Sequence, residues 1–136
     1  MATYTKFQCY VEDLAHGVHN FDSNTIKVAL SSAENAPSAS DDAVLGDITT
    51  IAAPAVDSVT LTKSSSGQTS GTYKYIPNDL TMTASGAVGP FQYVIIYNDT
   101  AASKPLICYF DYGSEVTLYA NDTITLEFGT ELFSLA

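Results

Sequence analysis

Two histidines, the only ones in the chain, stand three residues apart at His16 and His19, with Asp13 close before them. On a helix this spacing places the side chains near one another, where imidazole and carboxylate groups can bind a zinc ion. Gly17 lies between the histidines, however, and no further His or Cys completes a ligand motif. The pattern favours the C-terminal end of a helix, where histidine suits the helix dipole. We therefore expect no bound metal and no cofactor.

Other reactive residue types occur without the spacing that catalysis requires. The motif Gly-x-Ser-x-Gly is absent, and residues 64–71 lack the Gly-Lys-Ser/Thr of a phosphate-binding loop. Carboxylates at Asp41, Asp42, Asp99 and Asp111 could flank a glycosidase cleft or bind calcium, but nothing in the sequence places them together. We expect these four aspartates to be solvent-exposed loop residues instead. We predict that the protein is not an enzyme and that 64–71 is a flexible hairpin tip.

Composition describes a small, acidic domain with few charges. The 136 residues predict a single domain over 1–136. Charged residues make up 15%, below the usual share of about 25%, so the surface must be rich in Ser, Thr, Asn and Tyr. The net charge is −10, arginine is absent, and the lysines stand singly at Lys6, Lys27, Lys63, Lys74 and Lys104. We expect the protein to bind neither nucleic acid nor an anionic membrane, because both would be repelled.

Residues 1–6 lack the charged and apolar regions of a signal peptide, and no apolar run approaches the ~18 residues of a membrane-spanning helix. The sequence thus predicts synthesis in the cytoplasm of the producing cell. Cys9 and Cys108 are then expected to be buried thiols and not a disulfide. Residues 98–100 and 121–123 match the glycosylation triplet Asn-x-Thr, which in the absence of a signal is expected to be a pair of turns.

An apolar stripe with helical spacing lies near the start of the chain, at Phe7, Tyr10, Val11, Leu14 and Val18. It predicts a helix over residues 5–16, capped by Thr3 or Thr5 and ended by Gly17. So short a helix is marginal alone, so its stripe must dock on the sheet or on a neighbouring subunit.

The periodicity changes to two from about residue 24 onward. Short β-branched and aromatic runs follow at 26–30, 59–62, 73–76, 80–84, 90–97, 106–112, 116–119 and 123–128. Residues 31–43 read as a loop and 44–48 as one helical turn, while 51–54 is an ambiguous edge strand. Apolar residues on both faces of 93–97 indicate a central strand. The pattern predicts an all-β fold: an antiparallel β-sandwich or barrel of seven to eight strands with a short N-terminal α-helix.

Three stretches are familiar as a set: residues 21–30, which follow the Val-Glu-Asp-Leu run of 11–14; residues 66–73; and residues 89–100, which continue to 104–107 and 111–113. Together they resemble small virion-associated structural proteins of tailed bacteriophages over nearly the whole chain. The chain departs from this likeness at 52–55, where Ala-Ala-Pro-Ala stands in place of a glycine-rich stretch.

The resemblance implies a capsid decoration, or cement, protein that binds the outer surface of the major capsid lattice and resides in the virion. A net charge of −10 agrees, because it disfavours a place against packaged DNA. We expect a homo-oligomer, a trimer at a capsid symmetry axis, held partly by Tyr10, Val11 and Leu14. Two alternatives stay open. One is a tail or fibre component, and the other is a carbohydrate-binding module that uses surface tyrosines. We expect Tyr93, Tyr97, Tyr109 and Tyr119 to alternate between core and surface, and most tyrosines to pack the sheets.

Overall fold

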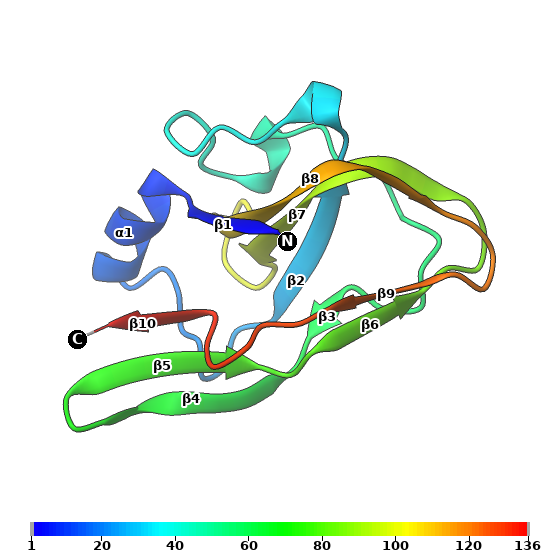
Figure 1. Ribbon diagram of the computed structural model, residues 1–136. Helices are drawn as coiled ribbons and strands as arrows, with labels where there is room; N and C mark the ends of the chain where they lie inside the picture. Colours follow the sequence, from blue (N-terminus) through cyan, green and yellow to red (C-terminus); the bar gives the residue numbers. More distant parts are fainter. Residues whose placement is uncertain (1, 136) are drawn as a thin grey trace.

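Ten strands and one α-helix form within residues 2–135, which are the residues that the structure, a computed structural model, describes (Figure 1). The strands are β1 (Thr3–Lys6), β2 (Ile26–Ser31), β3 (Thr60–Leu61), β4 (Lys63–Thr69), β5 (Thr72–Pro77), β6 (Leu80–Thr83), β7 (Val88–Asn98), β8 (Leu106–Leu118), β9 (Thr123–Leu126) and β10 (Phe133–Leu135). Helix α1 spans Gln8–Ala15, and two 3-10 turns, η1 (Ala33–Asn35) and η2 (Leu45–Asp47), lie between β2 and β3. The predicted all-β class with one short N-terminal helix is confirmed.

Three antiparallel sheets build the fold. The largest has the strand order β1-β8-β7-β2-β3, the second β10-β5-β4, and the third is the ribbon β6-β9. Both smaller sheets lie along the same side of the largest one (Figure 1). No helix in residues 2–135 is long and apolar enough to cross a membrane.

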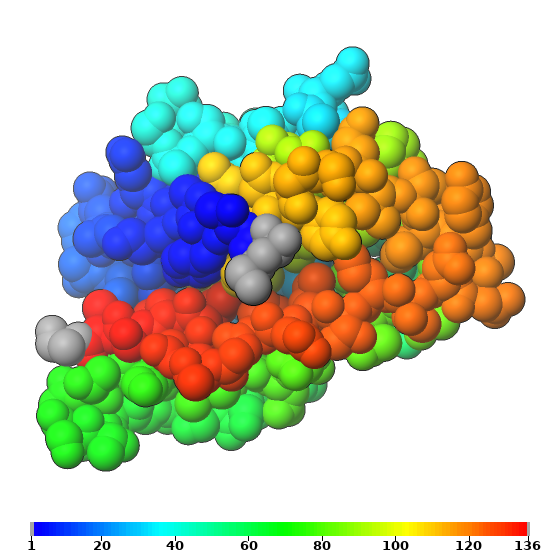
Figure 2. Space-filling view, in the orientation of Figure 1, coloured from blue at the N-terminus to red at the C-terminus, as the bar shows by residue number. Residues whose placement is uncertain are grey.

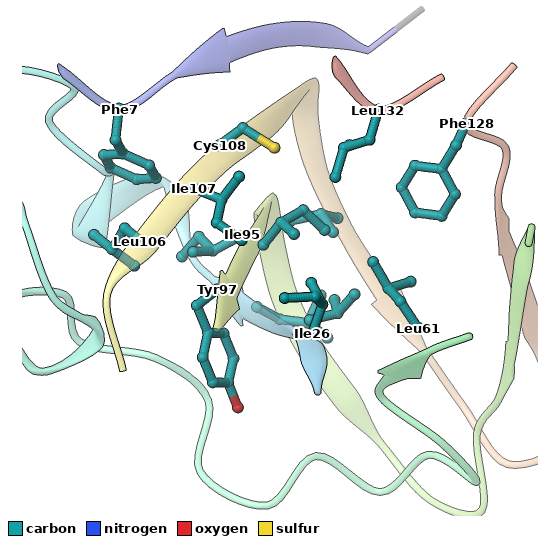
Figure 3. Close-up of a cluster of buried hydrophobic side chains, with 14 of the residues drawn as sticks. Phe7, Ile26, Leu61, Ile95, Tyr97, Leu106, Ile107, Cys108, Phe128 and Leu132 are labelled. Atoms are coloured by element: carbon teal, nitrogen blue, oxygen red, sulfur yellow. The ribbon is translucent and has the colours of Figure 1, made fainter. Parts of the chain in front are cut away.

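The core is centred on β7, because this strand pairs with β8 on one side and with β2 on the other. Residues 94–98 are each 7% exposed or less, as expected for a strand that is covered on both faces. Figure 3 shows Ile95 among side chains of β2 and β8, with Phe128 and Leu132 of the C-terminal segment on the side of Cys108. The prediction of a central strand here is confirmed.

The N-terminus differs from the predicted helix over 5–16. Residues 3–6 form strand β1 on the edge of β8, where Thr3 is opposite Asp111 and Lys6 is opposite Cys108. The helix begins only at Gln8, and its N-cap residue, Phe7, makes no side-chain cap. Tertiary pairing of the alternating Thr-Tyr-Thr-Lys run outweighs the weak capping preference of threonine. The predicted end of the helix is confirmed, because Gly17 follows it with a φ of 74°.

The stretch 64–71, predicted as a flexible tip, is mostly strand. Strand β4 runs to Thr69, and a two-residue turn with positive φ at both Ser70 (52°) and Gly71 (85°) connects it to β5. Positive φ at both positions is the type I′ geometry that matches the twist of a hairpin. Ser66 Oγ and Tyr73 OH also form a 2.6 Å hydrogen bond across the pair. The hairpin is confirmed, and its polar residues form an ordered edge strand.

Strand β8 continues through Gly113, where the sequence predicts a turn between two strands. Gly113 takes a φ of 91°, and its N–H donates a 2.8 Å hydrogen bond to the Asp111 carboxylate. The pairing of β8 with β7 resumes beyond it, with Val116 opposite Phe91. The glycine therefore bends one long strand, and the pair β7–β8 extends past the rest of the five-stranded sheet (Figure 1).

The segment between β2 and β3 packs beside the start of β8. Leu45 N–H donates to the Lys104 carbonyl at 2.9 Å, and Leu106 N–H donates to the Ala43 carbonyl at 3.0 Å. The predicted single helical turn at 44–48 is present as η2, whereas residues 51–54 form no strand.

Both cysteines are free thiols, as predicted. Cys108 lies fully inside the core, where burial raises the pKa of its thiol. Cys9 is half-buried on α1, and its Sγ is 3.5 Å from the Ala43 carbonyl oxygen.

Candidate interaction surface

The structure separates the three helix residues that the sequence predicts as an interface. Tyr10 is 3% exposed, and its ring packs against His19, Phe21 and Phe133 of its own domain. Leu14 is half-buried and packs against the same core. Val11 alone of the three presents its side chain to solvent, with 52% of it exposed. The buried side of the stripe thus docks α1 on the domain. Of the three residues, mainly Val11 remains accessible to a second subunit.

A concave apolar surface lies elsewhere, between the large sheet and the ribbon β6-β9. We call it the β8–β9 groove. Its volume is about 430 Å³, within the range of small binding sites. It is lined by Ala2, Phe91, Val94, Phe110, Tyr112, Ile124, Thr125, Leu126, Glu127 and Phe128. Figure 2 shows β8, in orange, next to the orange-red C-terminal part of the chain on this face of the molecule.

The strand register explains why this groove is aromatic. Phe110 is opposite Tyr4 on β1 and Val94 on β7, so the three side chains share one face of the sheet. The Tyr4 ring packs edge-on against Phe110 with ring centroids 5.4 Å apart, and the ring of Phe128, in the segment after β9, lies 6.1 Å from that of Phe110. Tyr112 stands two residues further along β8 on the same face and is 49% exposed. The groove therefore has an apolar floor and a tyrosine at its rim.

Two strand edges flank the groove. Strand β1 begins at Thr3, opposite Asp111, so within residues 2–135 the outer edge of β8 has no strand partner beyond that point. Strand β9 pairs only with β6 in the same part of the chain. Unpaired edges next to an apolar surface favour association with another protein chain.

Most residues that line the groove come from an acidic part of the chain, and Glu127 is the charged residue among those that line it. Residues 105–136, which form β8, β9 and β10, contain no Lys, Arg or His. They contain five carboxylates: Asp111, Glu115, Asp122, Glu127 and Glu131. Of these, Glu131 approaches a lysine, Lys74, at 3.9 Å. A partner for this side of the molecule would need positive charge.

The four tyrosines that are expected to alternate between core and surface lie mostly inside the fold. Tyr97 is buried, and the half-buried Tyr93 and Tyr109 pack against each other with ring centroids 6.0 Å apart. Tyr119 is exposed, and so are Tyr112 on β8 and Tyr4 on β1.

The two histidines do not share a site. His16 is exposed and lies 3.9 Å from Glu12, whereas His19 is turned into the core. Within residues 2–135 no cluster of His, Cys, Asp and Glu is placed to hold a metal ion.

The four carboxylates considered as catalytic groups each have a local role. Asp99 lies between Lys27 and Lys104, at 3.2 and 3.4 Å. Asp111 accepts a 2.9 Å hydrogen bond from Gln92. Asp41 and Asp42 accept hydrogen bonds from the side chain and the backbone N–H of Ser38 in one turn. The structure does not bring these carboxylates together into one cleft.

A buried polar cluster, which sequence reasoning missed, links β7 to the loops around it. Asn98 is 0% exposed, and its Nδ2 donates to His19 Nδ1 at 3.0 Å and to Asn24 Oδ1 at 2.9 Å. Its Oδ1 accepts from the backbone N–H groups of Thr100 and Ala101 at 3.0 and 3.1 Å. The predicted turn at 98–100 is therefore confirmed, and the asparagine that opens it also ties three segments together.

The cluster makes stability depend on pH through His19. Burial lowers the pKa of His19, and the Asp13 carboxylate opposes this by raising the pKa. His19 Nδ1 accepts a hydrogen bond from the Asn98 side-chain amide. A proton on Nδ1 would therefore place two hydrogen-bond donors face to face. The unfolded chain binds that proton at about pH 6.5, so it holds more protons than the native state just below this pH.

We expect the free energy of unfolding to fall as the pH drops below about 6.5, by at most about 1.4 kcal/mol per pH unit. Urea denaturation at pH 7.5, 6.5 and 5.5 measures this. His19→Gln should remove the dependence, whereas His16→Gln should keep it, because His16 is exposed. Equal slopes in wild type and His19→Gln would show that another group is responsible.

Comparison of the chain with models of protein families, with curated proteins and with solved structures gave no match. The chain's own surfaces and charge are thus the basis for inferring its function.

Proposed function

We propose that the protein is a capsid decoration, or cement, protein of a tailed bacteriophage. It would bind the outer surface of the major capsid lattice in many copies and stabilise it. The β8–β9 groove carries this proposal, because an apolar concavity beside strand edges that have no partner within residues 2–135 suits contact with another protein. The resemblance to small virion proteins points to the same class. It rests on residues 21–30, 66–73, 89–100, 104–107 and 111–113.

Charge supports the outer surface over the inner one. The net charge of −10 and the lack of arginine would repel packaged DNA. The low share of charged residues, 15%, suits a protein whose surface is partly covered in an assembly.

Addition of the purified protein to capsids of a phage from which its gene is deleted tests this function. We expect saturable binding to the capsids, and a higher temperature at which the loaded capsids release their DNA. Binding to isolated tails instead of capsids would favour a tail or fibre component. Binding to neither particle would contradict a virion role.

We also propose that the protein forms a trimer at a capsid symmetry axis, with Val11 in the contact. Val11→Asp is expected to dissociate the trimer or weaken capsid binding while changing the free energy of unfolding by less than about 0.5 kcal/mol, because Val11 is exposed. Leu14→Asp should instead destabilise the domain itself by about 2 kcal/mol, because Leu14 packs against the core. Sedimentation analysis and urea denaturation separate the two effects.

Ala87→Asp is the matched control, since it adds the same charge at an exposed position outside α1, just before β7. It should leave the assembly unchanged. A wild-type protein that stays monomeric both in solution and on the particle would defeat the trimer hypothesis.

A second candidate is a carbohydrate-binding module, which the exposed rings of Tyr112 and Tyr119 favour. It predicts that bacterial surface polysaccharide quenches tyrosine fluorescence, and that Tyr119→Ala or Tyr112→Ala removes the change. No quenching in the wild type would exclude this candidate.

A further inference from the structure

We propose that the outer edge of β9, which no strand covers in the described part of the chain, binds an extended segment of a partner protein as an added β-strand. Apolar side chains of that segment would enter the β8–β9 groove, and at least one Lys or Arg would lie beside Glu127. Binding at this edge does not depend on whether the partner protein belongs to a capsid.

The first support is the direction of the backbone groups in the ribbon β6-β9. Hydrogen-bonded and non-hydrogen-bonded pairs alternate along an antiparallel ladder. Ala84 N–H donates to the Asp122 carbonyl at 2.8 Å, so the next pair, Thr83 and Thr123, is non-hydrogen-bonded. Accordingly, Thr83 directs its N–H and C=O away from β9, to Asp57 at 2.8 and 3.2 Å.

The same alternation fixes Thr125. Two residues beyond Thr123, it is again in a non-hydrogen-bonded pair, opposite Thr81, and the two hydroxyls lie 2.9 Å apart. Its N–H and C=O therefore point away from β6. Thr125 also lines the groove and is exposed. The edge thus offers a donor and an acceptor to a further strand beside the groove, as in peptide recognition by strand addition.

The second support is the shape and polarity of the groove. One wall of the groove consists of the successive residues Ile124 to Phe128. Consecutive residues line a cavity when the edge of the strand, and not one of its faces, is turned toward it. The opposite wall holds Phe110 and Val94, which are apolar. Since side chains of an added strand alternate between two faces, every second residue of the occupant would enter the groove and should be apolar.

The third support is charge, which also identifies the kind of partner. Glu127 lies in the groove wall, and residues 105–136 contain carboxylates but no cations. A second copy of this chain is a poor occupant, because each copy has a net charge of −10 and its lysines stand singly. A basic and apolar segment of a different protein complements the site.

The test uses an eight-residue blocked peptide in which valine alternates with lysine and threonine, and the same peptide with glutamate in place of lysine. Backbone amide shifts in NMR spectra of the full chain report where each peptide binds. We expect the lysine peptide to shift the amides of 123–128 and Tyr112, and to bind about fivefold or more tightly than the glutamate peptide.

Two matched pairs of variants test the mechanism. Thr125→Pro removes the outward N–H and should weaken binding by about fivefold, whereas Thr81→Pro makes the same change on the opposite edge of the ribbon and should not. Glu127→Lys should weaken binding of the lysine peptide about fivefold, whereas Glu34→Lys, an equal charge change at an exposed position of η1, should not.

Several results would overturn the proposal. Amide shifts confined to another edge, such as β4, would place strand addition elsewhere. Equal binding by Thr125→Pro and Thr81→Pro would exclude backbone pairing at β9, and equal binding of the two peptides would exclude the charge preference. No shift with either peptide would exclude the site.

Discussion

Replacement of Asn98 by leucine is expected to lower the free energy of unfolding by about 3–5 kcal/mol. The leucine has a similar volume but can form none of the four hydrogen bonds of the asparagine side chain. It would leave the His19 ring, the Asn24 amide oxygen and the N–H groups of Thr100 and Ala101 without this partner. Such a loss is a large part of the about 5–15 kcal/mol that stabilises a typical domain. Urea denaturation at pH 7.5, followed by far-ultraviolet circular dichroism, measures it.

Two further variants locate the effect. Asn98→Asp keeps an acceptor for the N–H groups of the turn but loses the donors to His19 and Asn24, so it should also destabilise the protein. Asn78→Leu is the matched control, because Asn78 is exposed and its side chain makes a single 3.1 Å hydrogen bond to Thr62. It should cost less than about 1 kcal/mol. If Asn98→Leu cost no more than Asn78→Leu, the cluster would not be what joins these segments.

Gly89→Ala is expected to destabilise the protein by about 3 kcal/mol or more. Gly89 has a φ of +117°, which L-residues rarely adopt, and a Cβ atom there would lie 2.6 Å from the Val116 carbonyl oxygen. That oxygen belongs to the backbone of β8, which is paired with β7, so it cannot move away without disturbing the pair. Thermal and urea denaturation of the variant give the loss.

Gly113→Ala separates the two causes. Gly113 also has a positive φ, +91°, but a Cβ atom there meets nothing within 4 Å. Gly113→Ala should lower the free energy of unfolding by only about 1–2 kcal/mol, the cost of holding an L-residue at positive φ. The difference between the two variants is therefore the cost of close approach between β7 and β8. Equal losses would show that β8 adapts to the added methyl group.

Much of the fold follows from local pattern. The β-branched run of 93–97 is apolar at successive positions, and it becomes the central strand, where packed segments cover both faces of the sheet. The helical stripe ends at Gly17, as predicted. What the sequence could not specify is pairing between distant segments. Residues 3–6 carry a weak local preference and become a strand only because the edge of β8 is open beside them.

The β8–β9 groove could not be predicted from the sequence for the same reason. The groove needs Ala2, the aromatic residues of β7 and β8 and the edge of β9 at one place, and no single stretch of sequence carries that arrangement. Tyr10 belongs to the predicted stripe, but α1 uses it to dock on its own domain. Asn98 was predictable as a turn residue from the polar run that follows β7. Its role in the core depends on His19 and Asn24, which lie far away in the chain.

The central proposal is that the protein decorates a capsid, and its copy number per particle tests this most directly. Purified virions of the encoding phage, analysed by quantitative mass spectrometry, give the ratio of this chain to the major capsid protein. The proposal predicts a simple whole-number ratio set by the lattice, with the protein accessible to antibody on intact heads. A handful of copies per particle, located at the tail, or none at all, would contradict it.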